Sequence, residues 1–333
     1  MENNSAADSV DTKVAVEPKI PASADGIDAR RNDALNKKLS TSQQMRSQQQ
    51  QQLCIPPPNI DLECAYYDMI HEQRGLAIIL NHFKFDSKKY RNVQRNGTEK
   101  DCERLEKTFR ELDFEVNIYN DLKREEITRI LQKVADMDHQ NNDCIVVIVL
   151  SHGETGRLEA LDGNYPVDDI WEPFLNSQSL IGKPKLFFIQ ACRGDWTDPG
   201  VTVMAKNSSL TTGDMVDSLG HHKPQYFQIP SMADLLVMYS TYEGYYAWRN
   251  KDRGSCFIQA LCDELDTNGT KNDLFHLLTG VSRRVAFTFQ SNVPNNVDMH
   301  AMKQMPSIVS MLTRNLYFTR KGKRSVNHDT VTD

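Results

Sequence analysis

A cysteine and a histidine each follow a short apolar segment, and together they could perform nucleophilic catalysis. Cys192 lies in the stretch IQACRG, directly after the apolar residues 186–189, and His152 follows the apolar run 144–150. A thiol becomes a strong nucleophile when a nearby imidazole takes its proton, and histidine suits that exchange near pH 7. A cysteine beside a strand is more often a small core residue. The chemistry therefore depends on whether the fold brings the two segments together.

A glycine beside the histidine adds to this hypothesis. Gly153 follows His152, and because it lacks a Cβ its backbone can come close to a ligand. Its N–H and that of Cys192 could together hold the oxyanion that develops during acyl transfer. From position alone, a catalytic pair and an ordinary loop histidine beside a core cysteine remain equal alternatives.

The elements that must position these residues alternate between strands and helices. An unbroken apolar run such as 144–150 is typical of a parallel strand covered on both faces. If the strands before His152 and Cys192 are parallel neighbours, the two side chains emerge at the same edge of the sheet. The pattern predicts an α/β fold with a mostly parallel sheet between helices. Predicted strands are 76–80, 114–119, 144–150, 186–189, 235–239 and a last one near 308–318, and predicted helices are 98–112, with Thr98 as its cap, 124–137, 257–265 and 273–287.

Composition excludes several classes of protein. The chain is 39% apolar and 25% charged with a formal net charge of -6, which gives no reason to expect nucleic acid or an anionic membrane as a partner. Neither a run of 18 apolar residues nor a signal-peptide core is present, so a cytoplasmic protein is expected. The seven cysteines form no CxxC pair, which argues against a disulfide framework and a zinc site. We expect neither a metal nor a cofactor.

Three regions differ from the rest of the chain. Residues 1–60 are polar, include a glutamine run at 48–52 and a proline triplet, and are predicted to be disordered. Residues 195–230 are rich in Gly, Pro, Ser and Thr and predict a long loop, which in a compact domain is usually functional or disordered. The charged tail 321–333 is also expected to be disordered.

Several motifs show that the chain resembles the caspase family. QACRG at 190–194 with SHG at 151–153 matches the caspase signature. The segments QRNGTEKD, DLKREEI, YYAWRN and KQMPSIVSMLT are similar to caspase segments in the same order. The resemblance covers about residues 65–320 and is strongest to executioner caspases with a short propeptide. It implies a three-layer sandwich, with a six-stranded, mostly parallel sheet between helices that dimerises through its last strand.

The resemblance also implies an activity and a role for each site residue. It implies a cytosolic cysteine endopeptidase that cuts after aspartate and executes apoptosis, with Cys192 as nucleophile, His152 as acid/base and Gly153 as an oxyanion donor. The caspase histidine is oriented by a backbone carbonyl, here expected to be that of Val93. Arginine's rigid fork suits a buried carboxylate. The implied substrate-binding residues are Arg95, Gln190 and Arg249 for the aspartate, Tyr246 and Trp248 for the next subsite, and Asn250 for an acidic residue four positions before the cut.

Processing and partners follow from the same resemblance. Residues 1–60 would be a propeptide, 61–217 the large subunit, 195–230 the activation linker and 218–320 the small subunit. Activation is expected by cleavage after Asp217, in the sequence DMVD, and after Asp28. The expected partners are protein substrates with aspartate at the cleaved bond, a second copy forming a homodimer of subunit pairs, an upstream initiator caspase and inhibitor proteins.

The chain departs from the family pattern, and two alternatives stay open. Cys256 replaces a tryptophan, and residues 291–299 lack the phenylalanines expected in the loop over the substrate, so the preference for a distal aspartate is in doubt. A metacaspase-like peptidase that cuts after arginine or lysine would need acidic residues where Arg95 and Arg249 stand. A catalytically silent, caspase-shaped interaction protein would typically have lost the cysteine, the histidine or one of these arginines.

Overall fold

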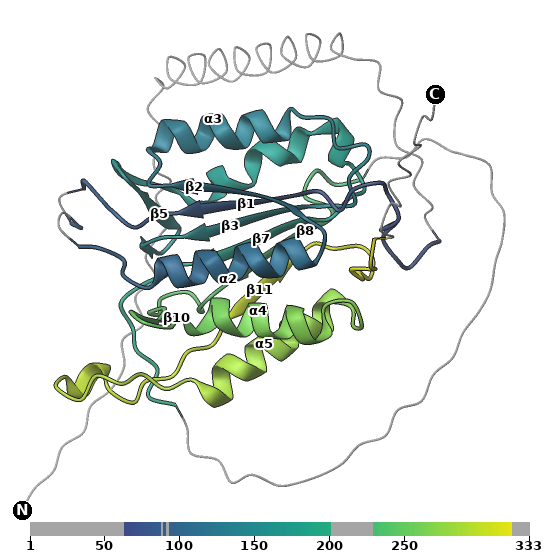
Figure 1. The fold of residues 1–333 in the computed structure, drawn as a ribbon. Helices are drawn as coiled ribbons and strands as arrows, with labels where there is room; N and C mark the ends of the chain where they lie inside the picture. The colour runs from purple at the N-terminus through teal and green to yellow at the C-terminus, as the bar shows by residue number, and fades with distance from the viewer. Residues whose placement is uncertain (1–62, 88, 91–92, 201–228, 322–333) are drawn as a thin grey trace, which may run out of the picture. The chain divides into compact units, whose positions relative to one another are not determined.

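A six-stranded sheet forms the centre of the computed structural model, which describes residues 63–87, 89–90, 93–200 and 229–321. The strand order is β11-β8-β7-β3-β1-β2, and every neighbouring pair is parallel except β11 with β8 (Figure 1). The predicted α/β fold with a mostly parallel sheet is confirmed. The strands are β1 (Leu76–Asn81), β2 (Glu115–Asn120), β3 (Ile145–Leu150), β7 (Lys185–Gln190), β8 (Leu235–Tyr239) and β11 (Ser307–Ser310).

Helices cover both faces of this sheet. On one face lie α2 (Thr98–Glu111), α4 (Cys256–Asn268) and α5 (Leu274–Thr288), and on the other lies α3 (Arg124–Ala135) (Figure 1). The 3-10 turns η1 (Val167–Ile170), η2 (Glu172–Asn176) and η3 (Gln178–Leu180) belong to the α3 side. Since successive side chains of a strand point to opposite faces, a strand covered on both faces must be apolar throughout. This explains the unbroken runs in β1, β3 and β7.

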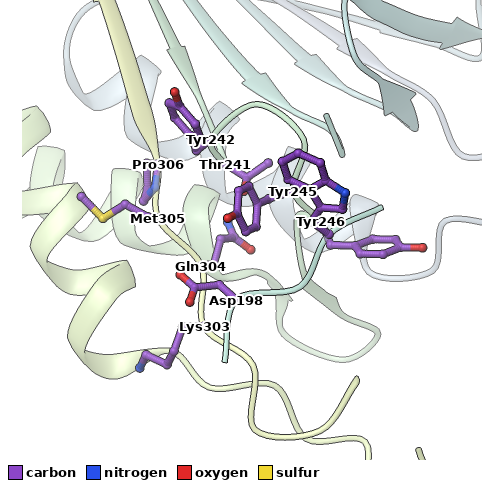
Figure 2. A pocket seen from close by; sticks show the side chains of 10 residues that line it. Asp198, Thr241, Tyr242, Tyr245, Tyr246, Lys303, Gln304, Met305 and Pro306 are labelled. Carbon is purple, nitrogen blue, oxygen red and sulfur yellow. The ribbon is translucent and has the colours of Figure 1, made fainter. Parts of the chain in front are cut away.

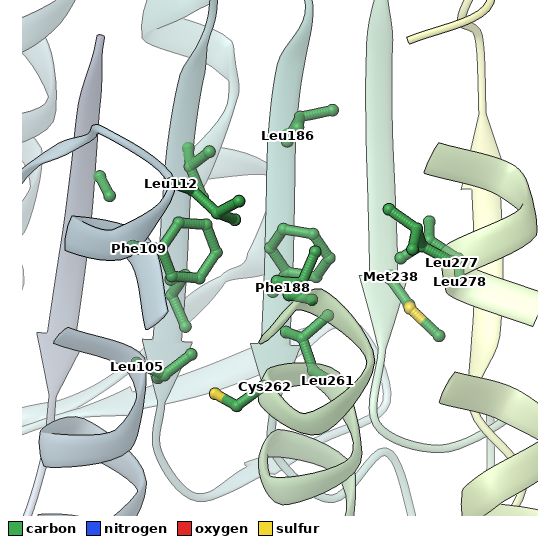
Figure 3. Close-up of a cluster of buried hydrophobic side chains, with 14 of the residues drawn as sticks. Leu105, Phe109, Leu112, Leu186, Phe188, Met238, Leu261, Cys262, Leu277 and Leu278 are labelled. Atoms are coloured by element: carbon green, nitrogen blue, oxygen red, sulfur yellow. The ribbon is translucent and has the colours of Figure 1, made fainter. Parts of the chain in front are cut away.

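The core on the α2 side shows how the helices use their apolar stripes. Leu105 and Phe109 of α2 and Leu261 of α4 pack against Phe188 of β7, while α5 covers Met238 of β8 (Figure 3). These side chains are almost completely buried. Burying a side chain of this size stabilises the fold by about 2–3 kcal/mol relative to leaving it in water. The sheet that carries the site is therefore held by packing from both sides.

Short strands complete the fold near the carboxyl ends of the main strands. β4 (Gly153–Glu154), β5 (Arg157–Ala160) and β6 (Gly163–Pro166) form a small antiparallel sheet directly after β3. β9 (Arg249–Asn250) pairs with β10 (Gly254–Ser255) just before α4, and the turn η4 (Val297–Met299) lies between α5 and β11.

The expected cap of the first helix is wrong. Gly97, with φ 91°, precedes α2, and no side chain caps this end. The Thr98 hydroxyl instead donates to Asn81 Oδ1 at 2.7 Å and accepts a hydrogen bond from Arg95 Nη1 at 2.9 Å. The hydroxyl is therefore directed towards β1 and the preceding loop rather than towards the amides of its own helix.

The last strand is also shorter than predicted, because it ends at Ser310 rather than near residue 318. Beyond it the chain leaves the sheet edge and pairs with residues 65–67: Asn315 N donates to Ala65 O at 2.8 Å. Leu316 and Phe318 are buried in the core without belonging to a strand. Their alternating pattern therefore reflects burial rather than a ladder.

Candidate active site

The two candidate catalytic residues follow neighbouring parallel strands. β3 pairs with β7 with Leu150 opposite Gln190, and Ser151 N donates to Gln190 O at 3.1 Å. His152 and Cys192 each come two residues after the end of their strand. The structure therefore places both residues at the same edge of the sheet, as the strand pattern predicted.

Gly153 lies against the backbone of the cysteine segment. A Cβ at this position would be 2.8 Å from Cys192 O and 3.1 Å from the Ala191 Cβ. Atoms at these distances must move apart, and the first of them is backbone. Only glycine fits here without displacing the segment that carries the thiol.

The Cys192 thiol is partly buried. Ala247 N donates a hydrogen bond to the sulfur at 3.4 Å. Burial raises the pKa of the thiol, whereas that hydrogen bond and the charges of Arg95 and Arg249 act in the opposite direction. The net effect favours the neutral thiol in the free protein.

The His152 imidazole is held by aromatic rings rather than by a hydrogen bond. It stacks on Tyr90, with ring centroids 4.3 Å apart and 5° between the planes, and the Phe85 centroid is 5.0 Å away. His152 Nε2 is buried without a hydrogen-bond partner. In the described part of the chain no hydrogen bond joins His152 to Val93, whose own N–H donates to Tyr90 O. The expected contact with the Val93 carbonyl is therefore not seen.

Burial and neighbouring cations keep this imidazole neutral. Burial is the main cause that lowers the pKa of His152 to about 3, and Arg95, Arg249 and Lys89 lower it further. Together with the raised pKa of the Cys192 thiol, this means that both groups are uncharged near pH 7. An uncharged thiol beside an uncharged imidazole suits general-base transfer of the thiol proton rather than a preformed ion pair.

Two arginines, Arg95 and Arg249, lie close enough to His152 and Cys192 to affect their pKa values. Arg95 is fully buried, and its Nη1 donates to His82 O at 3.0 Å and to Thr98. Its Nε and Nη2 are buried without a hydrogen-bond partner. Arg249, in β9, donates from Nε to Asn96 O at 2.9 Å. Gln190, the last residue of β7, is also buried, and its Oε1 lacks a hydrogen-bond partner among the described residues.

Neither arginine forms an ion pair with a carboxylate among the residues that the structure describes. Burial lowers the pKa of both guanidinium groups, and repulsion from Arg249 lowers that of Arg95 further, whereas the charge of Asp101 acts in the opposite direction on both. The buried Asp101 accepts from Ser255 N at 2.8 Å and from Gln259 Nε2 at 2.9 Å, and it forms no ion pair with either arginine. Unpaired buried charge is costly. A bound carboxylate would supply what the two guanidinium groups lack.

The other predicted substrate residues lie on and before β9. The rings of Tyr246 and Trp248 are 6.3 Å apart, and Trp248 also lies 6.3 Å from Phe289. Trp248 N donates to Gln304 Oε1 at 2.7 Å. Asn250 is exposed, and its Oδ1 accepts from the backbone of its own turn, at residues 252–253. Its amide nitrogen is the part of the side chain that could contact a substrate.

A cavity of about 250 Å³ lies beside Tyr246 (Figure 2). It forms where the segment after Cys192, the loop after β8 and the segment before β11 meet, and neither His152 nor Cys192 lines it. The sequence does not predict this cavity, because its lining residues come from three segments that are far apart in the sequence. The lining residues are Trp196, Asp198, Thr241, Tyr242, Tyr245, Tyr246, Lys303, Gln304, Met305 and Pro306.

The role of Phe85 and Tyr90 could also not be read from the sequence. They lie in a stretch without secondary structure between β1 and α2, and no motif sets them apart from ordinary loop aromatics.

No helix in the described ranges is long and apolar enough to cross a membrane.

Comparisons with known proteins agree with this geometry. The family model described as "Caspase domain" matches residues 74–317. Caspase-1 of Spodoptera frugiperda is 45% identical over 264 residues, which is 79% of this chain and 84% of that protein. Caspase drICE of Drosophila melanogaster is 45% identical over 78% of this chain and 74% of its own length. The crystal structure of Caspase-1 from Spodoptera frugiperda superposes with a TM-score of 0.72 at 42% identity, covering 82% of this chain and 99% of the solved one.

Proposed function

Because the chain belongs to the caspase family of cysteine endopeptidases, we propose that it cleaves proteins after aspartate with Cys192 as nucleophile and His152 as acid/base. The observation that carries the choice of substrate is the pair of arginines, Arg95 and Arg249. Neither forms an ion pair with a carboxylate among the described residues, and two buried nitrogens of Arg95 have no hydrogen-bond partner there. A substrate aspartate would bring that carboxylate, and a guanidinium can bind it through two parallel hydrogen bonds.

The proposed mechanism uses the neutral pair at the sheet edge. As the Cys192 sulfur attacks the carbonyl carbon of the substrate aspartate, His152 takes the thiol proton. The N–H groups of Gly153 and Cys192 stabilise the oxyanion. His152 then gives its proton to the leaving amine, and a thioester remains. Water, deprotonated by His152, hydrolyses the thioester and restores the thiol.

The test is hydrolysis of three fluorogenic tetrapeptides by the purified, cleaved protein. The peptides are identical except for aspartate, asparagine or arginine at the cleaved bond. We expect the aspartate peptide to be preferred over the asparagine peptide by at least about 10²-fold in kcat/KM, since losing one partner of a buried charge pair costs about 3–5 kcal/mol. A preference for the arginine peptide would indicate the metacaspase-like alternative, and no hydrolysis of any peptide would indicate the catalytically silent one.

The relatives support the expected role as an effector caspase in apoptosis. A cytosolic location remains part of the proposal, and the free state of the cysteines in the described residues agrees with a reducing compartment. Asp28 and Asp217 lie outside the described residues. Cleavage after Asp217, which would divide 61–217 from 218–320, and cleavage after Asp28 in the propeptide stay predictions that mass spectrometry of the active fragments would check. An initiator caspase and inhibitor proteins also stay predictions.

We further propose that the active protein is a homodimer joined through β11. This strand lies at an edge of the sheet, where its outer side has free backbone groups, and Val309 on it is 48% exposed. An exposed apolar edge strand pairs readily with another strand. Light scattering at micromolar concentration should give two pairs of large and small subunits for the cleaved protein, and one pair for the Val309→Lys variant.

The matched control for this prediction is Val297→Lys. Val297 is 84% exposed and lies in η4, outside the sheet. This variant should remain dimeric. A wild-type protein that scatters as a single large and small subunit pair would contradict the proposal.

A further inference from the structure

The stretch before α2 places an aromatic ring flat against the candidate catalytic base. The Tyr90 and His152 rings are nearly parallel, with centroids 4.3 Å apart. The Phe85 ring is tilted by 51° against the imidazole at 5.0 Å, and it also contacts Tyr90 at 5.8 Å. Two rings from one segment therefore enclose the imidazole of another.

An ion pair connects this segment with the strand that follows the histidine. Lys89 Nζ lies 3.1 Å from Glu154 Oε2 and 5.2 Å from the centre of the Tyr90 ring. Glu154 belongs to β4, which starts directly after His152. Both charged groups are largely exposed, so the pair contributes little energy by itself. It marks where the Tyr90 segment and the strand after His152 meet.

Orientation of a catalytic imidazole usually comes from a hydrogen bond to one of its nitrogens. Within the described residues His152 Nε2 has no hydrogen-bond partner, and no hydrogen bond joins His152 to Val93. We propose that Tyr90 is a positioning residue, which by stacking holds the His152 imidazole in the orientation needed to exchange a proton with Cys192. This inference rests on the proposed function, because it assumes that His152 is the catalytic base.

The same ring excludes water from the imidazole. Burial is the largest cause of the lowered pKa of His152, so opening one face of the ring to water should raise that pKa. Catalysis needs the neutral imidazole. When the solution is acidified, an imidazole with a higher pKa becomes protonated at a higher pH, so activity is lost at a higher pH. The charged and titratable groups around His152, Tyr90 and Cys192 are Lys89, Arg95, Glu154, Glu159, Asp195 and Arg249.

The experiment compares Tyr90→Ala with Tyr90→Phe in the cleaved enzyme, using the aspartate peptide. Tyr90→Ala should lower kcat by about tenfold, which is the scale of one aromatic stacking contact, and should leave KM unchanged, since Tyr90 is not part of the arginine pocket. The acid limb of its kcat/KM profile should move to higher pH. Tyr90→Phe keeps the ring and should match the wild type in both respects. Tyr90→Leu, which is apolar but cannot stack, serves if the alanine variant folds poorly.

Tyr66→Ala is the matched control, because Tyr66 is 54% exposed and its ring pairs with Tyr317 away from the site. It should leave kcat and the pH profile unchanged. Wild-type kcat and an unmoved acid limb in Tyr90→Ala would overturn the inference, as would an equal loss in Tyr90→Phe. His152→Ala tests the acid/base role of His152 separately from the positioning role of Tyr90. If His152→Ala stays active, His152 is not the catalytic base, and the role proposed for Tyr90 fails with it. If it is inactive while Tyr90→Ala is unaffected, the positioning role alone fails.

Discussion

Cys192→Ala is expected to lower kcat by at least about 10⁴-fold on the aspartate peptide, because removal of a nucleophile leaves only the contribution of substrate binding and of the oxyanion donors. The change removes one sulfur atom that is partly exposed at the end of β7. It also removes the 3.4 Å hydrogen bond that Ala247 N donates to this sulfur. The melting temperature should therefore stay close to that of the wild type, and thermal unfolding monitored by circular dichroism checks this.

Cys256→Ala provides the control for this prediction. Cys256 packs against the core at the start of α4, and burial raises the pKa of its thiol, so it is a poor nucleophile. This variant should keep nearly full activity. Near wild-type turnover by Cys192→Ala would show that the thiol at the sheet edge is not the nucleophile.

The sequence predicted the sheet edge well because strong physical constraints act there. A strand buried on both faces must be apolar throughout, and parallel neighbours must end at the same edge. These two facts sufficed to bring His152 and Cys192 together. The substrate pocket is different, because Arg95 and Arg249 are 154 residues apart and nothing in the apolar pattern links them. Their pairing depends on contacts such as Arg249 Nε with Asn96 O, and only the family motifs pointed to it.

The parts that the sequence could not predict are those where local and tertiary contacts compete. Thr98 has the right residue type for a cap, yet a tertiary partner, Asn81, takes its hydroxyl. Phe318 has the alternation of a strand, yet it is buried by packing against Phe114, with ring centroids 5.9 Å apart. The stacking of Tyr90 on His152 depends on the path of a segment that has no regular structure. In each case the outcome is set by groups distant in the sequence.

The second large effect is expected at the arginine pocket. Arg249→Ala should lower kcat/KM for the aspartate peptide by about 10²–10³-fold, because a substrate carboxylate would then be buried with one guanidinium fewer. Arg95→Ala should have at least the same effect, but its Nη1 also bonds to His82 O and Thr98. Part of that decrease could come from the loop, so Arg249 gives the cleaner test.

The decisive readout is selectivity rather than rate. If Arg249 binds the substrate carboxylate, its removal should penalise the aspartate peptide far more than the uncharged asparagine peptide, so the ratio of the two kcat/KM values should fall towards one. For Arg249→Lys this ratio should lie between those of the wild type and of Arg249→Ala, because an ammonium keeps the charge but cannot bind two carboxylate oxygens as the planar guanidinium does. Arg110→Ala is the control: Arg110 is exposed on α2 and pairs with Glu106 at 2.9 Å, so its removal should leave the ratio unchanged. A slower Arg249→Ala enzyme with the wild-type ratio would place Arg249 in the support of the β9 loop and remove it from recognition of aspartate.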